Sequence, residues 1–406
     1  MELLHEKCAG LDVHKESVVA CVRLARGKGE HHLETFGTTT RELLRVLDWL
    51  RSYGVTHVAM EATGVYWKPV WHVLDGHFEL VLGNAHEIKN VPGRKSDVKD
   101  ATWISDLLAH GLIRSSFVPP QPIAELRDLT RTRKQLVAER SQHTQRIQKV
   151  LEDANVKLSS VVTDILGLSG RAILGALIRG ETDPRRLAKL ADARVKATKA
   201  QLEDALMGRI RDHHRFLLRL HLDQIDALDQ SIRKIENKVE ELLVPFGSLM
   251  ERLQTIPGIK GVAAAVLLAE LGDDMSKFPT AGHLVSWACL CPGQDESAGK
   301  KRSTRTRKAQ WLKATLVQAA WAAVKRKDTY LHAQFHRIRA RRGAKKAILA
   351  VASSILTAAY YIIKNGTSYQ DLGPDYFQRH DHHRAAHRLV QRLQQMGFAV
   401  QLQPAA

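Results

Sequence analysis

Apolar and polar positions alternate between a strand pattern and a helix pattern over the first 118 residues. A period of two favours strands, and a period near 3.6 favours helices. The predicted strands are a hairpin over residues 8–24 and short buried strands at 55–61 and 78–82; the predicted helices are 39–53 and 64–74. Residues 84–94 have the composition of a loop, and Ser96 is a candidate N-cap for the next helix. The pattern predicts an α/β domain over residues 1–118.

A proline-rich break at residues 118–122 ends this domain. Beyond it, residues 123–158 predict one long helix, and after a looser region at 167–184 a second long helix is expected from about residue 195 to residue 243. The second helix carries a heptad seam, listed as Ile225, Leu228, Ile232, Ile235, Val239 and Leu242. Residues 119–250 therefore predict a helical, coiled-coil arm. Its seam fits an intramolecular antiparallel pair and a dimer contact equally well.

Residues 251–372 predict a third, mostly helical domain. Gly258 and Gly261 lie between two apolar helical segments, which is the pattern of a helix-hairpin-helix turn whose backbone N–H groups can meet a phosphate. A plain helix-turn-helix packing unit is the alternative. A C-terminal extension, residues 373–406, predicts an amphipathic helix and then a strand at 398–402. The histidines of this extension fit that helix better than a metal site.

Charge changes the picture of what the chain binds. The sequence holds 61 Lys and Arg against 43 Asp and Glu, a formal net charge of +18. Such an excess favours nucleic-acid phosphates as partners, with an anionic membrane surface as the competing interpretation. No apolar run approaches the roughly 20 residues of a transmembrane helix, and no signal-peptide core is present. We therefore expect a protein of the cytoplasm, without a membrane partner and with its four cysteines reduced.

Four carboxylates in the first quarter of the chain are the candidate catalytic residues. They are Asp12 in G-L-D-V-H-K, Glu61 in M-E-A-T-G-V-Y, and Asp97 and Asp100 in K-S-D-V-K-D-A. Asp12 falls on the first predicted strand, Glu61 at the end of a later one, and the other two one turn apart on a helix. In a ribonuclease-H-like mixed sheet, these elements converge near the strand ends. Oxygen ligands suit magnesium, which predicts a divalent-metal phosphodiester site.

A second candidate site lies in the third domain. Ser297 follows C-P-G-Q-D-E in a loop of small residues, and a dense cationic run comes next: Lys300, Lys301, Arg302, Arg305, Arg307 and Lys308. Phosphate binding is the role that best explains such a run, and a solvated charged loop is the alternative. A nucleophilic serine needs cations over the developing charge, which this loop offers, and a metal or base, which the sequence alone does not place beside it.

These motifs resemble the insertion-sequence-110 family of transposases, whose N-terminal domain is similar to the Holliday-junction resolvase RuvC. The resemblance covers roughly residues 8–330, with the G-L-D-V-H-K, M-E-A-T-G-V-Y-W, K-S-D-V-K-D-A, T-I-P-G-I and C-P-G-Q-D-E-S-A-G-K segments in family order. It implies that Asp12, Glu61, Asp97 and Asp100 form a DEDD site for magnesium, for which manganese is a substitute. It also implies that Ser297 attacks DNA to give a phosphoserine intermediate.

The resemblance further implies the partners. Family members act on donor and target DNA, use an element-encoded bridge RNA, and work as homo-oligomers of two to four chains in which one protomer's acidic domain meets another's serine. In a prokaryote, such a protein would work at the nucleoid. Two alternatives remain open: a RuvC-like structure-selective nuclease or resolvase in which Ser297 only contacts phosphate, and a catalytically decayed nucleic-acid-binding protein.

Overall fold

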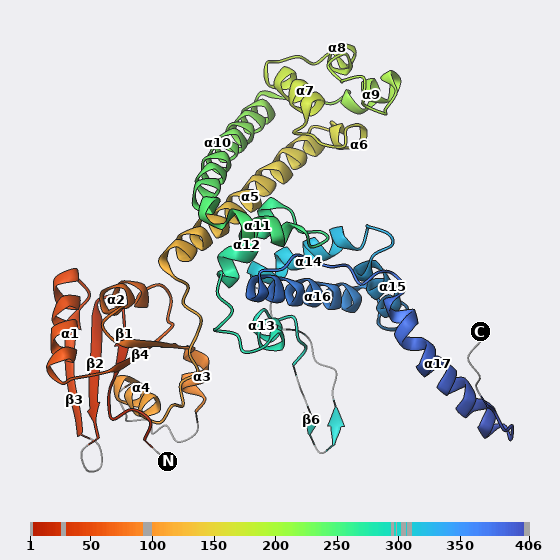
Figure 1. The fold of residues 1–406 in the computed structure, drawn as a ribbon. Coiled ribbons are helices and arrows are strands. Elements are labelled where there is room, and N and C mark those ends of the chain that lie inside the picture. The colour runs from red at the N-terminus through yellow and green to blue at the C-terminus, as the bar shows by residue number, and fades with distance from the viewer. Residues whose placement is uncertain are drawn as a thin grey trace. The chain divides into compact units, whose positions relative to one another are not determined.

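The computed structural model describes residues 3–25, 30–91, 100–293, 296–297, 299–301, 306 and 311–401. The chain divides into two compact units, Met1–Val118 and Pro119–Ala406. Figure 1 shows an α/β unit at the N-terminal end and an all-helical unit with one small hairpin after it. The predicted α/β plus α class is confirmed at this level, while the predicted domain boundaries within the second unit stay predictions.

A five-stranded mixed sheet forms the centre of the first unit. Its strands are β1 Lys7–Val13, β2 Ser17–Leu24, β3 Glu30–Gly37, β4 His57–Glu61 and β5 Glu79–Gly83. Their order is β3-β2-β1-β4-β5, with antiparallel pairs among the first three and parallel pairs from β1 to β4 and from β4 to β5. This mixed sheet is consistent with the expected RuvC-like domain.

Helices cover both faces of the sheet, and its central strands β1 and β2 are therefore buried on both sides. Helices α1 Thr40–Ser52 and α2 Trp67–Leu74 pack on one face. Helices α3 Ala85–Lys89 and α4 Asp100–Ala109 pack on the other. Successive strand residues point to opposite faces. Thus Ala9 and Leu11 belong to the core under α1, whereas Cys8 belongs to the core under α4.

Two elements of this unit differ from the sequence-based expectation. Strand β3 was assigned to no element because its sequence, E-H-H-L-E-T-F-G, is polar; as an edge strand it is half exposed and needs few apolar residues. Residues 84–94, expected as a loop, contain α3, for which the Asn84 side chain accepts a hydrogen bond from the His86 backbone N–H at 2.9 Å as an N-cap.

Two long helices form an arm in the second unit: α5 Gln121–Asp153 and α10 Asp212–Leu243. They run side by side in opposite directions (Figure 1). Ile225, Ile232 and Val239, seven residues apart, are buried. Arg133 bonds Glu236 at 2.6 Å and Arg140 bonds Asp229 at 2.6 Å, so that the pairs follow opposite directions along the two helices. The heptad seam therefore serves an intramolecular pair; its further role in a coiled coil between chains stays a prediction.

Between the two long helices, the chain folds into a small lobe with its own core. Its helices are α6 Leu158–Val161, α7 Leu168–Ile178, α8 Pro184–Ala188 and α9 Lys199–Leu206. The expected looser region thus contains the buried helix α7. The expected second long helix from residue 195 is also wrong, because the chain breaks between α9 and α10. Gly208 lies at this break, where a Cβ would stand 2.5 Å from Val156 Cγ2 and 2.6 Å from the Ala154 carbonyl oxygen.

The base of the arm and the C-terminal helices share the largest core, which includes Leu126 of α5. The remaining elements are a 3-10 turn η1 Val244–Phe246, α11 Gly247–Gln254, α12 Gly261–Leu271, α13 Ala281–Trp287, strands β6 Glu296–Ser297 and β7 Lys300–Lys301, α14 Trp311–Ala323, α15 Tyr330–Arg342, α16 Ala344–Asn365 and α17 Tyr376–Gln395. The helical extension is present as α17, but residues 398–401 form no strand among the described positions.

Helix α16 corrects the expectation that no apolar run reaches membrane-spanning length. Its 22 residues are long and apolar enough to cross a membrane by length and composition. Its buried side chains, among them Val351, Ile355 and Tyr360, lie in the core of the second unit. The Tyr360 hydroxyl also donates a hydrogen bond to the Phe278 carbonyl at 2.9 Å. These contacts explain the apolar composition of α16 as that of a core helix.

Candidate functional site

Asp12 and Glu61 lie at the carboxyl ends of two neighbouring parallel strands. The register pairs Leu11 of β1 with Met60 of β4, which puts the two carboxylates at the next step of each strand. Leu11 and Met60 point into the core under α1, so that Asp12 and Glu61, by alternation, point to the face that α4 covers. The side chain of Asp12 is 22% exposed and that of Glu61 12% exposed. Two carboxylates thus share one half-buried edge of the sheet.

A glycine lets α4 bring Asp100 to this edge. Gly10 lies on the same face as Asp12, two residues earlier, and a Cβ there would stand 2.3 Å from the Ala101 carbonyl oxygen and 2.4 Å from the Ser105 backbone nitrogen. Only a glycine allows such a close approach of helix and strand. Asp100 is the first residue of α4, immediately before Ala101. The close packing at Gly10 therefore fixes the third carboxylate near the end of β1.

The charges at this edge interact. Burial raises the pKa of Asp12 above its usual value, and the negative charges of Asp100 and Glu61 raise it further. His14 opposes them, since its Nε2 lies 3.1 Å from Asp12 Oδ2 and its electrostatic and hydrogen-bonding effects lower the same pKa. Asp100 and Glu61 are thus both close enough to Asp12 to repel its charge, which is an arrangement that a bound cation would relieve.

Two further side chains contact Glu61, and neither is among the residues that the sequence predicts for the site. Thr63 donates a hydrogen bond from Oγ1 to Glu61 Oε1 at 2.6 Å, and Lys89 Nζ lies 3.9 Å from the same oxygen. Lys89 belongs to α3, in the stretch expected to be a loop. The Asn84 N-cap was the signal that could have revealed this short helix. Lys89 places a cation beside the carboxylates, in reach of a phosphate bound there.

The fourth predicted carboxylate, Asp97, lies outside the described residues. Asp106, a further carboxylate of α4, has a structural role: its Oδ1 accepts hydrogen bonds from Arg23 Nε at 2.9 Å and from His31 Nε2 at 3.0 Å. It therefore ties α4 to β2 and β3, away from Asp12.

Ser297 lies in a short β-hairpin of the second unit. Strands β6 and β7 pair Ser297 with Lys300, and Gly299 forms the turn with a φ of +75°. Lys300 is exposed. The side chains of Ser297 and Lys301 and the residues Arg302, Arg305, Arg307 and Lys308 lie outside the described part of the structure. Their assignment as nucleophile and phosphate contacts stays a prediction.

Gly258 and Gly261 occupy the turn between α11 and α12, as the sequence indicates. Gly258 has a φ of +84°, and a Cβ there would stand 2.1 Å from the Ala319 carbonyl oxygen of α14. Close packing against α14 explains this glycine without a phosphate. Gly261, in contrast, is exposed at the first turn of α12, with only Gln254 Oε1 near its missing Cβ, at 3.9 Å. A phosphate contact at this turn stays a prediction and would fall to Gly261.

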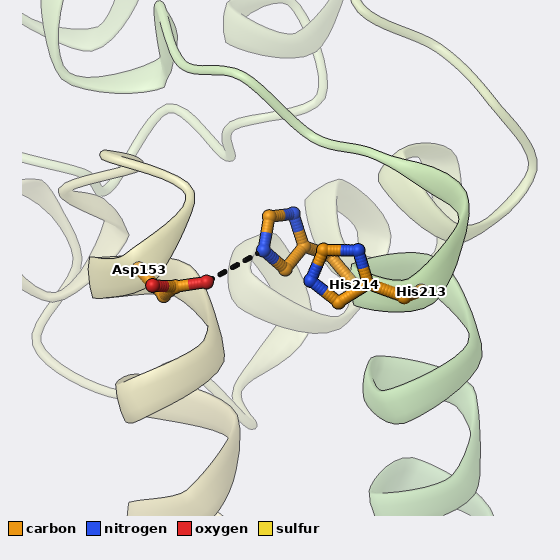
Figure 2. Close-up of side chains that lie close together, drawn as sticks. All are labelled: Asp153, His213 and His214. Atoms are coloured by element: carbon orange, nitrogen blue, oxygen red, sulfur yellow. Dashed lines mark hydrogen bonds and ion pairs between the residues drawn. The ribbon is translucent and has the colours of Figure 1, made fainter.

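Asp153, His213 and His214 form a second cluster of metal-ligand type, at the base of the lobe (Figure 2). Their ligand atoms lie within 4.8 Å of one another. However, the Arg211 backbone N–H donates to His214 Nδ1 at 3.2 Å, so a neutral His214 carries its proton on Nε2. That nitrogen then donates to Asp153 Oδ2 at 2.8 Å. A metal on Nε2 would take the place of this proton. The neutral ring would then carry its proton on Nδ1, which could no longer accept the hydrogen bond from the Arg211 backbone N–H. We therefore assign the cluster to a structural contact that joins the end of α5 to the start of α10.

Comparison with known proteins gives the family. Residues 9–156 match the family model of the DEDD transposase of IS110, and residues 250–337 match the model of the IS116/IS110/IS902 transposase family. The chain is also 26% identical over 306 residues to an uncharacterised 43.6 kDa protein of insertion element IS110 from Streptomyces coelicolor. That alignment covers 70% of this chain and 74% of the relative. The two matched segments contain the carboxylate edge and the Ser297 hairpin, respectively. The resemblance found in the sequence is thereby confirmed, and this chain belongs to the IS110 family of transposases.

Proposed function

We propose that this transposase cuts and rejoins DNA strands through a serine nucleophile, Ser297, assisted by a magnesium site made of Asp12, Glu61, Asp97 and Asp100. The observation that carries the proposal is the gathering of Asp12, Glu61 and Asp100 at one edge of the sheet, where the charges of Asp100 and Glu61 raise the pKa of Asp12. Family membership supplies the reaction class, because a transposase cuts and joins DNA.

The residues at this edge fit a divalent cation. Carboxylate oxygens are the ligands that magnesium and manganese prefer, and at this edge the charges of Asp100 and Glu61 act on Asp12. Asp12, Glu61 and Asp100, joined by Asp97, would hold the ion. When bound, magnesium would supply Lewis-acid activation of the phosphate oxygens. Lys89, 3.9 Å from Glu61, would orient the phosphate through its charge.

With Ser297 as the nucleophile, the reaction would conserve the energy of the phosphoester bond. Its Oγ would attack the phosphorus of one DNA strand, form a phosphoserine bond, and release the other side of the break as a hydroxyl group. A hydroxyl of a second strand would then attack the phosphoserine and free the serine. Each step exchanges one phosphoester bond for another, so no external energy source is needed for rejoining. Lys300 and the cations after it would hold the charged phosphate during both steps.

The partners follow from the same proposal. Donor and target DNA are the substrates, and a bridge RNA encoded by the element would select them by base pairing, in a homo-oligomer that joins the carboxylates of one protomer to the serine of another. The work would take place in the cytoplasm, at the nucleoid. The net charge of +18 supports contact with several nucleic-acid strands at once.

The test is a covalent-adduct assay. Purified protein is incubated with magnesium, DNA carrying the element ends and RNA transcribed from the element's flank, and protein–DNA adducts are resolved on a denaturing gel. We expect an adduct mapped to Ser297, absent in Ser297→Ala and in Asp12→Asn, and retained in Ser286→Ala, a matched exposed serine of the same unit. Full strand cleavage by Ser297→Ala, with loss in Asp12→Asn, would replace the serine mechanism with hydrolysis of the RuvC type. If the wild-type protein does not cleave, the binding-protein alternative gains support.

A further inference from the structure

A basic turn joins α15 to α16, and the function proposed above makes no use of it. We define it by its four cations: Arg341, Arg342, Lys345 and Lys346. All four side chains are exposed. Over residues 329–370 the sequence contains seven Lys and Arg and not one Asp or Glu. Within the described part of the chain, none of the four cations makes a hydrogen bond or an ion pair.

Several other exposed cations of this unit, in contrast, have acidic partners. Arg194 lies 2.7 Å from Asp192, and Lys238 lies 2.6 Å from Glu241. An unpaired cation keeps its full charge available for an external anion, whereas a paired one has part of it neutralised. The basic turn is therefore a different kind of surface from the mixed-charge faces of the arm.

Fold stability does not explain the two lysines of the turn. Cations near the C-terminus of a helix are favourable, which gives Arg341 and Arg342 at the end of α15 a structural reason. Lys345 and Lys346, in contrast, lie in the first turn of α16, where the helix dipole disfavours positive charge. These two lysines lower the stability of α16 and repel the neighbouring arginines, so an anion bound from outside explains them better than fold stability does.

The turn is also held on a rigid support. Directly after it, α16 enters the core with Ala347, Ile348 and Val351. Gln334 of α15 donates a hydrogen bond to Ser354 Oγ of α16 at 2.9 Å, which helps fix the two helices against each other. The four cations are thus presented from a fixed hairpin, so that little order has to be imposed on the backbone when a ligand binds.

We propose that the basic turn binds the phosphate backbone of double-stranded DNA, as a second DNA contact outside the Ser297 hairpin and the carboxylate edge. DNA is favoured as the partner because the chain belongs to a transposase family. The proposal rests on that membership and on the charges of the turn, not on the serine chemistry. A backbone contact of this kind carries no sequence information but fixes the position of the duplex.

The test measures binding without chemistry. Full-length protein is titrated, in EDTA, against a fluorescent mixed-sequence duplex of about 30 base pairs at several salt concentrations. The basic-turn variant carries R341Q, R342Q, K345Q and K346Q. The matched control removes the same charge from four cations that have acidic partners: R186Q, R194Q, K199Q and K238Q. A third variant, R341K, R342K, K345R and K346R, keeps the charge of the turn, and thermal melting checks that each variant is folded.

The basic-turn variant is expected to bind the duplex at least about tenfold more weakly at moderate salt, and its salt slope is expected to fall by about 3.6, near 0.9 for each of the four lost phosphate contacts. The control should lose less than about threefold, and the charge-keeping variant should bind like the wild type. Equal loss in the control and the basic-turn variant would reduce the effect to net charge and overturn the proposal. Unchanged duplex binding would also overturn it, including the case in which only binding of a structured RNA is lost.

Discussion

Gly10 is important because it has no side chain. A side chain there would meet the backbone of α4, at Ala101 and Ser105. Asp100 precedes that contact directly, so the distance between α4 and β1 decides whether the third carboxylate reaches Asp12. The small and weakly polar neighbours Cys8 and Ser105, the latter fully buried, belong to the same close contact, in which the Cys8 thiol donates to the Ser105 carbonyl.

Gly10→Ala is expected to lower the free energy of unfolding by about 1–3 kcal/mol, because the added methyl group overpacks a backbone contact. It should also lower DNA cleavage, since α4 has to move away from β1 with Asp100. Urea unfolding and the adduct assay measure the two effects. Gly37→Ala is the control, because the atom that its Cβ would meet is a flexible Glu42 side-chain carbon at 3.1 Å. If Gly10→Ala matches this control in both assays, the close approach does not position the site.

At this scale, sequence patterns predicted the carboxylates that the structure brings to one edge, but not what positions them. Asp12, Glu61 and Asp100 lie in short, unusual motifs, and their convergence needs only the order of strands and helices. The role of Gly10 requires knowing that α4 crosses β1 at that residue, which no local pattern contains. Lys89 was missed for a similar reason, because a helix of five residues has too little periodicity to stand out.

A buried ion pair connects the arm to the C-terminal core. Glu270 of α12 is 3% exposed and accepts two hydrogen bonds from Arg131 of α5, at 2.8 and 2.7 Å. Arg127, one turn earlier, donates to the carbonyl oxygens of Ala269 and Glu270, both at 2.9 Å. Burial lowers the pKa of Arg127 to about 10, against the opposing charge of Glu270. Glu270 thus supplies a buried counter-charge to Arg127 and accepts both guanidinium hydrogen bonds of Arg131.

Glu270→Ala is therefore expected to cost about 3–5 kcal/mol of unfolding free energy, because it removes the buried counter-charge of Arg127 and breaks the ion pair with Arg131. Urea denaturation followed by circular dichroism measures the loss. The matched control is Glu241→Ala, which removes the exposed partner of Lys238 and should cost less than about 1 kcal/mol. Equal and small losses in both variants would mean that the α5–α12 contact is held by apolar packing alone.

A histidine pair makes the arm sensitive to pH. The Nδ1 atoms of His143 in α5 and His221 in α10 lie 3.3 Å apart. Burial lowers the pKa of His221, and the charges of His143 and Arg146 lower it further. The unfolded chain therefore binds a proton at this position more readily than the folded chain, and stability falls as the pH drops through the unfolded value near 6.5.

His221→Asn should weaken this pH dependence. We expect the urea midpoint of the wild type to fall more between about pH 7.5 and about pH 5.5 than that of the variant, with the difference closing at the higher pH. His72→Asn, which removes an exposed histidine of the first unit, serves as the control and should behave like the wild type. An identical decline in His221→Asn would show that other groups set the acid sensitivity.

At the scale of elements, periodicity predicted the long helices well and their interruptions poorly. The seam of α10 was visible because Ile225, Ile232 and Val239 recur every seven residues. The break before it depends on Gly208 packing against Ala154 and Val156, residues more than fifty positions earlier in the chain. Strand β3 was missed because an edge strand keeps polar residues, and hydrogen bonds to β2 rather than hydrophobic pattern hold it in place.

For the whole molecule, the sequence predicted a nucleic-acid enzyme with two distant sets of functional residues, and the comparisons confirm the transposase family. The carboxylates belong to the first unit and the Ser297 hairpin to the second. No local pattern can say how two such sets meet; their meeting across the subunits of an oligomer stays a proposal. What the sequence could supply was the chemistry of each set.

The central claim is that Asp12, Glu61 and Asp100 hold a divalent cation. The direct test is manganese binding to the full-length protein, followed by electron paramagnetic resonance, in the wild type and in Asp12→Asn, Glu61→Gln and Asp100→Asn. Asp48→Asn, an exposed carboxylate of the same unit, is the control. We expect each of the three variants to bind manganese at least about tenfold more weakly, while the control binds like the wild type. Manganese binding that is unchanged in all three variants would contradict the account.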